Sequence, residues 1–235
     1  MKMKTAIVIP AHNEEKNIPL LVEDLLKLKR DFWIIFVNDN SSDKSKKVIQ
    51  DLMKKNDQIK MVDRKRQEGL GEAIISGLKK AIEMNVSGVI TMDGDLSHPT
   101  QKIPELIREG EAYDLVVGSR FIKDGGTEKW SFQKKLMSFI ARHTSRVVLN
   151  IKTRDCSSGM KYYSKEILDF YDFDSFISSG YAFQIETVLL AEKNQFKIKE
   201  VPITFKGRKY GESKVDFSEL KRYIKSVGLL LKIRN

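Results

Sequence analysis

Cysteine is scarce in this chain of 235 residues, in which Cys156 stands alone. A single cysteine excludes an internal disulfide framework, and with only three histidines a structural zinc cluster lacks ligands. No apolar run approaches the roughly 18–20 residues of a membrane-spanning helix. The opening run TAIVIP is also too short for a secretion signal. We therefore expect no transmembrane segment, and a reducing cytosol fits the cysteine content best.

Two common nucleotide-binding motifs are missing as well. The glycines of EGLGEAIISG do not form G-x-G-x-x-G, because position 74 is Ile, and no G-x-x-x-x-G-K-[ST] occurs. A nicotinamide dehydrogenase and a P-loop kinase are therefore unsupported. Repeats, low-complexity tracts and flexible linkers are also missing. We expect one large domain over 1–216, followed by a basic amphipathic helix over 217–235.

The net charge of +10 is unevenly distributed, because the excess of Lys and Arg falls in 120–149 and 197–235. Such basic segments attract nucleic acid, anionic lipid or phosphorylated substrates alike. A nucleic-acid-binding module would explain the charge but not the acidic Asp93-Gly94-Asp95, and no recognition helix or stacking platform is evident. Nucleic acid is therefore not an expected partner.

Short runs rich in Val and Ile alternate with helical periodicities. The predicted strands span 5–10, 33–39, 58–64, 87–93, 112–121 and 195–206. This alternation predicts an α/β fold with a Rossmann-like, mostly parallel sheet and helices on both faces. Ligands then belong at the carboxyl ends of the strands.

The sharpest motif is Asp93-Gly94-Asp95, at the end of a predicted buried strand. Two carboxylates one residue apart can bind a hard divalent cation that also holds a diphosphate. A chance acidic turn is the alternative. An apolar strand that delivers two anions to one point is costly unless a cation or donor meets them, which favours a site.

Eight segments occur in the order typical of one enzyme family: IPAHNEEKNI, VNDNSSD, GLGEAIISG, MDGDLSHP, VGSRF, RDCSSGMKYY, GYAFQIE and EVPITFKGRKYGESK. The chain resembles the family 2 inverting glycosyltransferases of GT-A fold, and more narrowly the dolichyl-phosphate mannose synthases. The resemblance covers essentially the whole chain, and its last segment is the most specific.

The resemblance implies a role for particular residues in donor binding. The donor-binding set is Pro10, His12, Glu14, Val37, Asp39, Asp93, Gly94, Asp95, Arg208 and Lys214. Asp93 and Asp95 would hold Mg²⁺ or Mn²⁺. His12 stands where the family commonly has Tyr, and Asn38 replaces the first of two usual aspartates at the nucleoside site.

The resemblance also implies an acceptor site for a lipid phosphate. Its residues are Arg120, Lys134, Ser138 and Arg208, and the catalytic residues are Asp93, Asp95 and Arg120. Lys134 replaces an arginine, so it keeps the charge but loses the bidentate fork. Asp155 is expected to support the site rather than to catalyse, and Gln184 and Glu186 are either plain helix positions or braces of the site.

The implied reaction transfers mannose from GDP-mannose to dolichyl (polyprenyl) phosphate, by metal-dependent inverting displacement. The products would be dolichyl β-D-mannosyl phosphate and GDP. The acceptor is a phosphate monoester, mostly dianionic near neutral pH, so no general base is needed. The same scaffold with UDP-glucose as donor is the alternative.

A soluble enzyme with a lipid acceptor has to reach a membrane. The stretch 130–149 is amphipathic, and its Lys134, Ser138 and Arg142 share one helical face. It is either a core helix with a solvated basic face or, like 217–235, an interfacial helix. We expect peripheral association with the cytoplasmic face of the ER or plasma membrane, or docking to a small membrane-spanning subunit.

Overall fold

The computed structural model describes residues 4–128, 132–178, 180–211 and 217–234. The strands are β1 (Thr5–Ala11), β2 (Phe32–Asp39), β3 (Ile59–Arg64), β4 (Gly88–Thr91), β5 (Leu115–Ser119), β6 (Gly126–Thr127), β7 (Lys161–Ser164), β8 (Ile198–Pro202) and β9 (Thr204–Phe205). The α-helices are α1 (Asn17–Leu26), α2 (Ser45–Met53), α3 (Leu70–Glu83), α4 (Ile103–Glu109), α5 (Phe132–Leu149), α6 (Lys165–Phe170), α7 (Phe183–Lys193) and α8 (Phe217–Arg234). Short 3₁₀ helices are η1 (Thr100–Lys102), η2 (Phe173–Ser175) and η3 (Gly180–Ala182).

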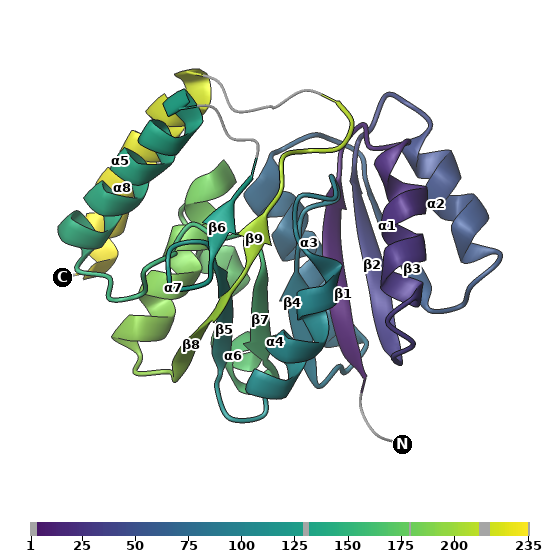
Figure 1. The fold of residues 1–235 in the computed structure, drawn as a ribbon, viewed down its shortest axis with the longest axis horizontal. Coiled ribbons are helices and arrows are strands. Elements are labelled where there is room, and N and C mark those ends of the chain that lie inside the picture. The colour runs from purple at the N-terminus through teal and green to yellow at the C-terminus, as the bar shows by residue number, and fades with distance from the viewer. Residues whose placement is uncertain (1–3, 129–131, 179, 212–216, 235) are drawn as a thin grey trace.

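A seven-stranded sheet forms the centre of the molecule, with the strand order β3-β2-β1-β4-β7-β5-β8 (Figure 1). Its strands pair in parallel except β7, which is antiparallel to both β4 and β5. The prediction of a mostly parallel α/β sheet is confirmed. The antiparallel strand β7 was not predicted. Strands β6 and β9 form a separate parallel pair.

Helices cover both faces of the sheet, as the continuous apolar runs of the strands predict. On β1, Ile7 and Ile9 pack with residues of α1, α2 and α4, whereas Ala6 and Val8 pack with residues of α3 and α7. The alternation along one strand thus supplies two separate cores. All four of these side chains are fully buried.

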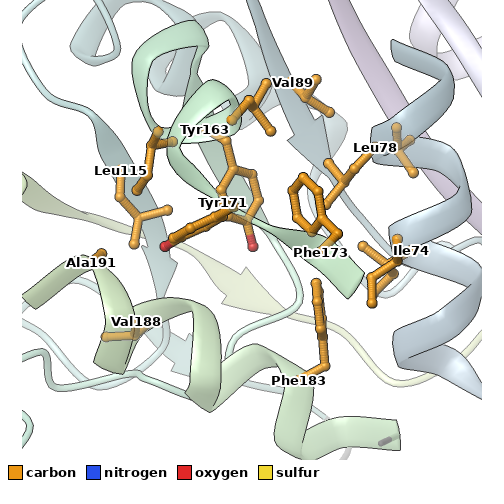
Figure 2. Packing of buried hydrophobic residues seen from close by; sticks show 14 of the residues in the cluster. Ile74, Leu78, Val89, Leu115, Tyr163, Tyr171, Phe173, Phe183, Val188 and Ala191 are labelled. Atoms are coloured by element: carbon orange, nitrogen blue, oxygen red, sulfur yellow. The ribbon is translucent and has the colours of Figure 1, made fainter. Parts of the chain in front are cut away.

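The core beneath α3 contains a group of aromatic rings (Figure 2). Tyr171 meets Phe173 edge to face with ring centroids 5.8 Å apart, and Phe176 lies 5.4 Å from Phe183. Such pairs add about 0.5–1.5 kcal/mol each beyond the area that they bury. They fix α7 against α3, and with it the segment that leads back to the sheet.

Helices α5 and α8 lie side by side at one end of the molecule (Figure 1). The hydroxyls of Ser145 and Tyr223 hydrogen-bond between them, and Val227 and Leu230 are buried. Within the described residues, no helix is long and apolar enough to span a bilayer. The predicted domain boundary after residue 216 falls at residues outside the described part and stays a prediction.

Candidate active site

The two acidic side chains after β4 are held by the turn that follows them. Asp95 Oδ1 accepts hydrogen bonds from the amide and hydroxyl of Ser97, at 3.0 and 2.5 Å. The Asp93 amide donates to His98 Nδ1 at 3.0 Å, so His98 supports the turn through an unprotonated ring nitrogen. The side chain of Asp93 is 30% exposed to solvent, and that of Asp95 is 12% exposed. The Asp93 carboxylate therefore remains partly accessible at the carboxyl edge of the sheet, whereas Asp95 is mostly buried.

Two glycines let the main chain approach this pair closely. A Cβ on Gly94 would lie 3.1 Å from the carbonyl oxygen of Pro10, and a Cβ on Gly159 would lie 3.2 Å from Asp93 Oδ1. The carboxyl ends of β1 and β4 and the start of β7 thus meet around Asp93. A larger residue at 94 would crowd the main chain of β1, and one at 159 would crowd the side chains of Asp93 and His98.

Burial raises the pKa of the Asp93 carboxyl, and the negative charge of Asp95 adds to this rise. The cationic neighbours Arg120 and Arg208 act in the opposite direction without cancelling it. An acidic pair of this kind gains stability from any further positive charge placed between its members.

The loop over 206–210 brings a cation to the acidic pair, in the segment that crosses the carboxyl ends of the strands (Figure 1). Arg208 Nη1 donates to Glu14 Oε1 at 2.6 Å, and Arg208 Nε lies 3.3 Å from Asp95 Oδ2. The Lys209 amide also donates to the Asp95 carbonyl oxygen. Although burial opposes it, Asp95 and Glu14 raise the pKa of Arg208, which keeps the guanidinium charged.

Arg120, after β5, is locked by a buried carboxylate. Asp155 accepts from the Arg120 amide and Nε at 2.8 Å and from Nη2 at 2.7 Å, and Ser157 Oγ accepts from Nη2 at 3.0 Å. Glu200 in turn accepts from the amides of Arg154 and Asp155. Burial opposes the ionised form, but Arg120 lowers the pKa of Asp155 overall. Asp155 therefore supports Arg120, in the role predicted for it.

At the end of β2, Asp39 is paired with Arg64, a residue that the sequence did not single out. Arg64 Nη1 lies 2.5 Å from Asp39 Oδ1, and Arg64 Nη2 bonds to Glu68. His12 Nδ1 lies 2.9 Å from the Asp39 carbonyl oxygen. The predicted nucleoside residues His12 and Asp39 thus lie together.

Two further positions at this end contribute mainly structure. The Val37 side chain is fully buried in the core, so at this position only the main chain is left to contact a nucleoside. Asn38 donates to Asp63 Oδ1 at 2.7 Å. Asn38 thereby links β2 to β3 at their carboxyl ends.

The acceptor residues are described only in part. Ser138 lies half-buried on α5, whereas the side chain of Lys134 and the whole of Lys214 fall outside the described part of the chain. Pro10, Glu14, Asp93, Gly94, Asp95 and Arg208 converge in one place, because their contacts link the ends of β1 and β4 to the 206–210 loop.

Behind the site, α7 carries the two polar residues left open by the sequence. Glu186 accepts from the amides of Ile177 and Ser178 at 3.0 and 2.9 Å. Gln184 accepts from the buried Lys161 Nζ through both its main-chain and side-chain oxygens. Both therefore brace the segments around the site rather than face solvent.

The acidic pair fits a divalent cation that takes further ligands from a substrate. In the described part of the chain, no group of three or more His, Cys, Asp or Glu residues could hold a metal by itself. Within the same residues, the Asp93 carboxylate accepts no hydrogen bond; its nearest cationic or imidazole nitrogen is His98 Nδ1 at 3.7 Å. Mg²⁺ in particular is bound by one or two carboxylates together with substrate phosphates.

Comparison with known families shows which family the chain belongs to. The family model described as Glycosyl transferase family 2 matches residues 6–171. The chain belongs to glycosyltransferase family 2. This transferase is 31% identical over 220 residues to polyprenol monophosphomannose synthase of Mycolicibacterium smegmatis, with 93% of the chain and 83% of the relative covered. It is 29% identical over 213 residues to undecaprenyl-phosphate mannosyltransferase of Micrococcus luteus, with 91% of the chain and 88% of the relative covered.

Solved structures agree with the GT-A fold of the transferase. Glucosyl-3-phosphoglycerate synthase of Mycobacterium tuberculosis, solved with Mn²⁺, UDP and glucosyl-3-phosphoglycerate, matches with a TM-score of 0.69 at 20% identity, over 99% of the chain and 80% of that protein. A mannosyltransferase of Pyrobaculum calidifontis, solved with GDP-Man and Mn²⁺, matches with a TM-score of 0.65 at 12% identity. The match covers 100% of this chain and 65% of that protein. The predicted fold is confirmed.

Proposed function

We propose that this glycosyltransferase moves mannose from GDP-mannose to a polyprenyl phosphate such as dolichyl phosphate. The names of the two relatives support mannosyl transfer to a polyprenyl phosphate. The observation that carries the proposal is the pairing of two centres. One is the acidic pair with Arg208, suited to a nucleotide diphosphate, and the other is Arg120, which is close enough to influence the charge of Asp93.

At the donor centre, Asp93 and Asp95 would hold Mg²⁺ or Mn²⁺. A bound cation would supply charge neutralisation for the diphosphate of the donor. Arg208 adds a fixed positive charge at the same place, because Glu14 and Asp95 hold its guanidinium from two sides. The charge that develops on the departing GDP is thereby stabilised without reorganisation of the site.

At the acceptor centre, the nucleophile is a phosphate oxygen that is already ionised near neutral pH. Glu14 accepts hydrogen bonds from Asn17 and Arg208, and Asp95 accepts one from the Ser97 amide. Neither carboxylate is needed as a base. Arg120 attracts the phosphate and orients it, because Asp155 fixes its guanidinium plane.

The bond changes follow from this arrangement. A phosphate oxygen forms a bond to the anomeric carbon while the bond from that carbon to GDP breaks, and the electron pair leaves with GDP. A displacement in line inverts the anomeric centre, so an α-linked donor gives a β-linked product, through a transition state with oxocarbenium character. No proton transfer is required.

The outer face of α5 supports contact with a membrane surface. Phe139 and Val147 are 52% and 65% exposed, and with His143 they recur at every fourth residue along one face. Arg142 and Arg146 flank this face. Apolar residues between basic ones are typical of helices that lie in the plane of an interface. Flotation with anionic liposomes should weaken in a Phe139→Ser/Val147→Ser variant and stay unchanged in a Phe170→Ser variant, whose exposed ring lies on α6.

The experiment that tests the proposed function is a product assay with two donors and two acceptors. The protein is incubated with Mn²⁺ and either GDP-mannose or UDP-glucose, and with either a short polyprenyl phosphate or the corresponding polyprenol. Mass detection should find mannosyl phosphate lipid in one of the four mixtures. Product from UDP-glucose alone would show that UDP-glucose, not GDP-mannose, is the donor. Product from the polyprenol would contradict a mechanism that works without a general base.

A further inference from the structure

The ring of Phe121 is contacted by two guanidinium groups from different elements. The Cζ of Arg120, the preceding residue, lies 5.2 Å from the ring centroid, and the Cζ of Arg142, from α5, lies 4.4 Å from it. The Cζ atoms of the two guanidinium groups are therefore no more than about 10 Å apart. Arg142 was not among the residues that the resemblance assigns.

The two arginines differ in how their charge is balanced. Arg120 is neutralised by Asp155. Arg142 has no carboxylate within ion-pair distance in the described ranges, and its one hydrogen bond there is a long one, from Nη1 to the Arg154 carbonyl oxygen at 3.4 Å. Its Nε is buried without an acceptor in the same part of the chain. A buried donor on a cation that lacks an acceptor calls for an explanation, and an anionic ligand is the one that chemistry suggests.

We propose that Arg142 binds the phosphate of the acceptor together with Arg120. This inference rests on the proposed function, and it names a further residue for the same acceptor. Arg142 adds a positive charge that no described carboxylate balances, and its planar fork can engage two phosphate oxygens while a third attacks. Ser138, one turn earlier on the same helix face, adds a hydroxyl donor.

The chain also offers a reason for an arginine at this position. Lys134, on the same helix, can supply charge but no bidentate fork. Arg142 lies two turns later on the same face of the helix and supplies the fork. The stacking of its guanidinium on Phe121 and Phe139, at 4.4 and 5.5 Å, keeps the group in place before the phosphate arrives.

Arg146, on the same helix, is a matched control that tests whether Arg142 has a purely structural role. Arg146, one turn later, also donates to a loop carbonyl, that of Lys152 at 3.2 Å, and its Nε also lacks an acceptor in the described part. Arg146 makes no cation–π contact with Phe121 among the described residues. The location beside Arg120 is therefore what separates the two arginines.

The test compares Arg142→Gln, Arg142→Lys and Arg146→Gln, with a short, water-soluble prenyl phosphate as probe so that membrane affinity plays no part. Direct titration of the probe without donor should show at least about tenfold weaker binding for Arg142→Gln, an intermediate loss for Arg142→Lys, and near wild-type binding for Arg146→Gln. In turnover with GDP-mannose, Arg142→Gln should raise the KM for the prenyl phosphate, while GDP affinity stays unchanged.

Equal probe affinities for Arg142→Gln and Arg146→Gln would overturn the role of Arg142. If the wild-type protein binds the probe in an Arg142-dependent manner but transfers no mannose, the phosphate site stands and the proposed donor fails. If the wild-type protein binds no prenyl phosphate at all, both the site and the proposed function fail.

Discussion

Arg120 and Asp155 form a bidentate ion pair in which the carboxylate is fully buried and the arginine side chain is 9% exposed. The two residues are 35 positions apart in sequence. Their pairing joins the end of β5 to the loop before β7, and it holds the guanidinium where its charge opposes the rise that burial causes in the pKa of Asp93.

Removing the negative charge of Asp155 from this buried ion pair should lower the stability of the fold. Asp155→Asn leaves the Arg120 guanidinium without its counter-charge in the interior, and we expect a loss of about 3–5 kcal/mol in the free energy of unfolding. Urea denaturation measures it. The control is Asp169→Asn, which removes an exposed pair with Lys165 and should change stability by less than about 1 kcal/mol. Equal effects of the two variants would contradict the interior role of Asp155.

Lys161 makes the stability of the fold depend on pH in an unusual direction. Its Nζ is fully buried and donates to Gln184 and Thr187, and burial lowers the pKa of Lys161 from 10.5 to about 7. Between pH 7 and 9 the unfolded chain keeps this proton and the folded chain loses it, so stability rises with pH, by up to about 1.4 kcal/mol per unit. Below pH 7 both states are protonated and this contribution is flat.

Thermal or urea unfolding of the wild-type protein and of Lys161→Met, from pH 6 to 9, checks this. The stability of the wild-type protein should increase relative to that of the variant as the pH passes 7. A difference that is constant over this range, or one that shrinks, would show that Lys161 stays charged inside the fold.

Two helical glycines should respond to alanine in opposite directions. A Cβ on Gly77 in α3 would overlap the side chains of Val8 and Val37, whereas a Cβ on Gly228 in α8 meets nothing within 4 Å. Gly77→Ala should therefore destabilise the protein by about 1–3 kcal/mol through overpacking. Gly228→Ala should stabilise it by up to about 1 kcal/mol through helix propensity. Differential scanning calorimetry of both variants compares their melting temperatures, and an unchanged or raised melting temperature for Gly77→Ala would contradict the close contact of α3 with β1 and β2.

The sequence predicted those parts of the molecule that depend on local pattern. The continuous apolar strands and the intervening helical periodicities are local, and so is the position of Asp93 and Asp95 after a buried strand. The antiparallel β7 was missed because it spans only KYYS and buries a lysine, so it shows no apolar alternation. Its direction depends on pairing with β4 and β5, which local pattern does not reveal.

The partners of the site residues could not be predicted for the same physical reason. Arg64 meets Asp39 from the next strand, and Arg208 meets Glu14 across 194 positions. Such pairs form because the carboxyl ends of parallel strands converge, not because of any spacing in the chain. The resemblance supplied Arg208 and Glu14, and helical spacing placed Arg142 on the face of Lys134 and Ser138, whereas Arg64 and the contact of Arg142 with Phe121 became visible only in three dimensions.

The most direct test of the account is the initial rate of mannosyl phosphate lipid formation from GDP-mannose and Mn²⁺, measured for the wild-type protein and for Asp93→Asn. The loss of several kcal/mol of charge stabilisation should slow the variant by at least about 100-fold. Its melting temperature should stay close to that of the wild-type protein, because Asp93 accepts no hydrogen bond through its carboxylate within the described residues. A folded Asp93→Asn variant with near wild-type turnover would contradict the assignment of the acidic pair.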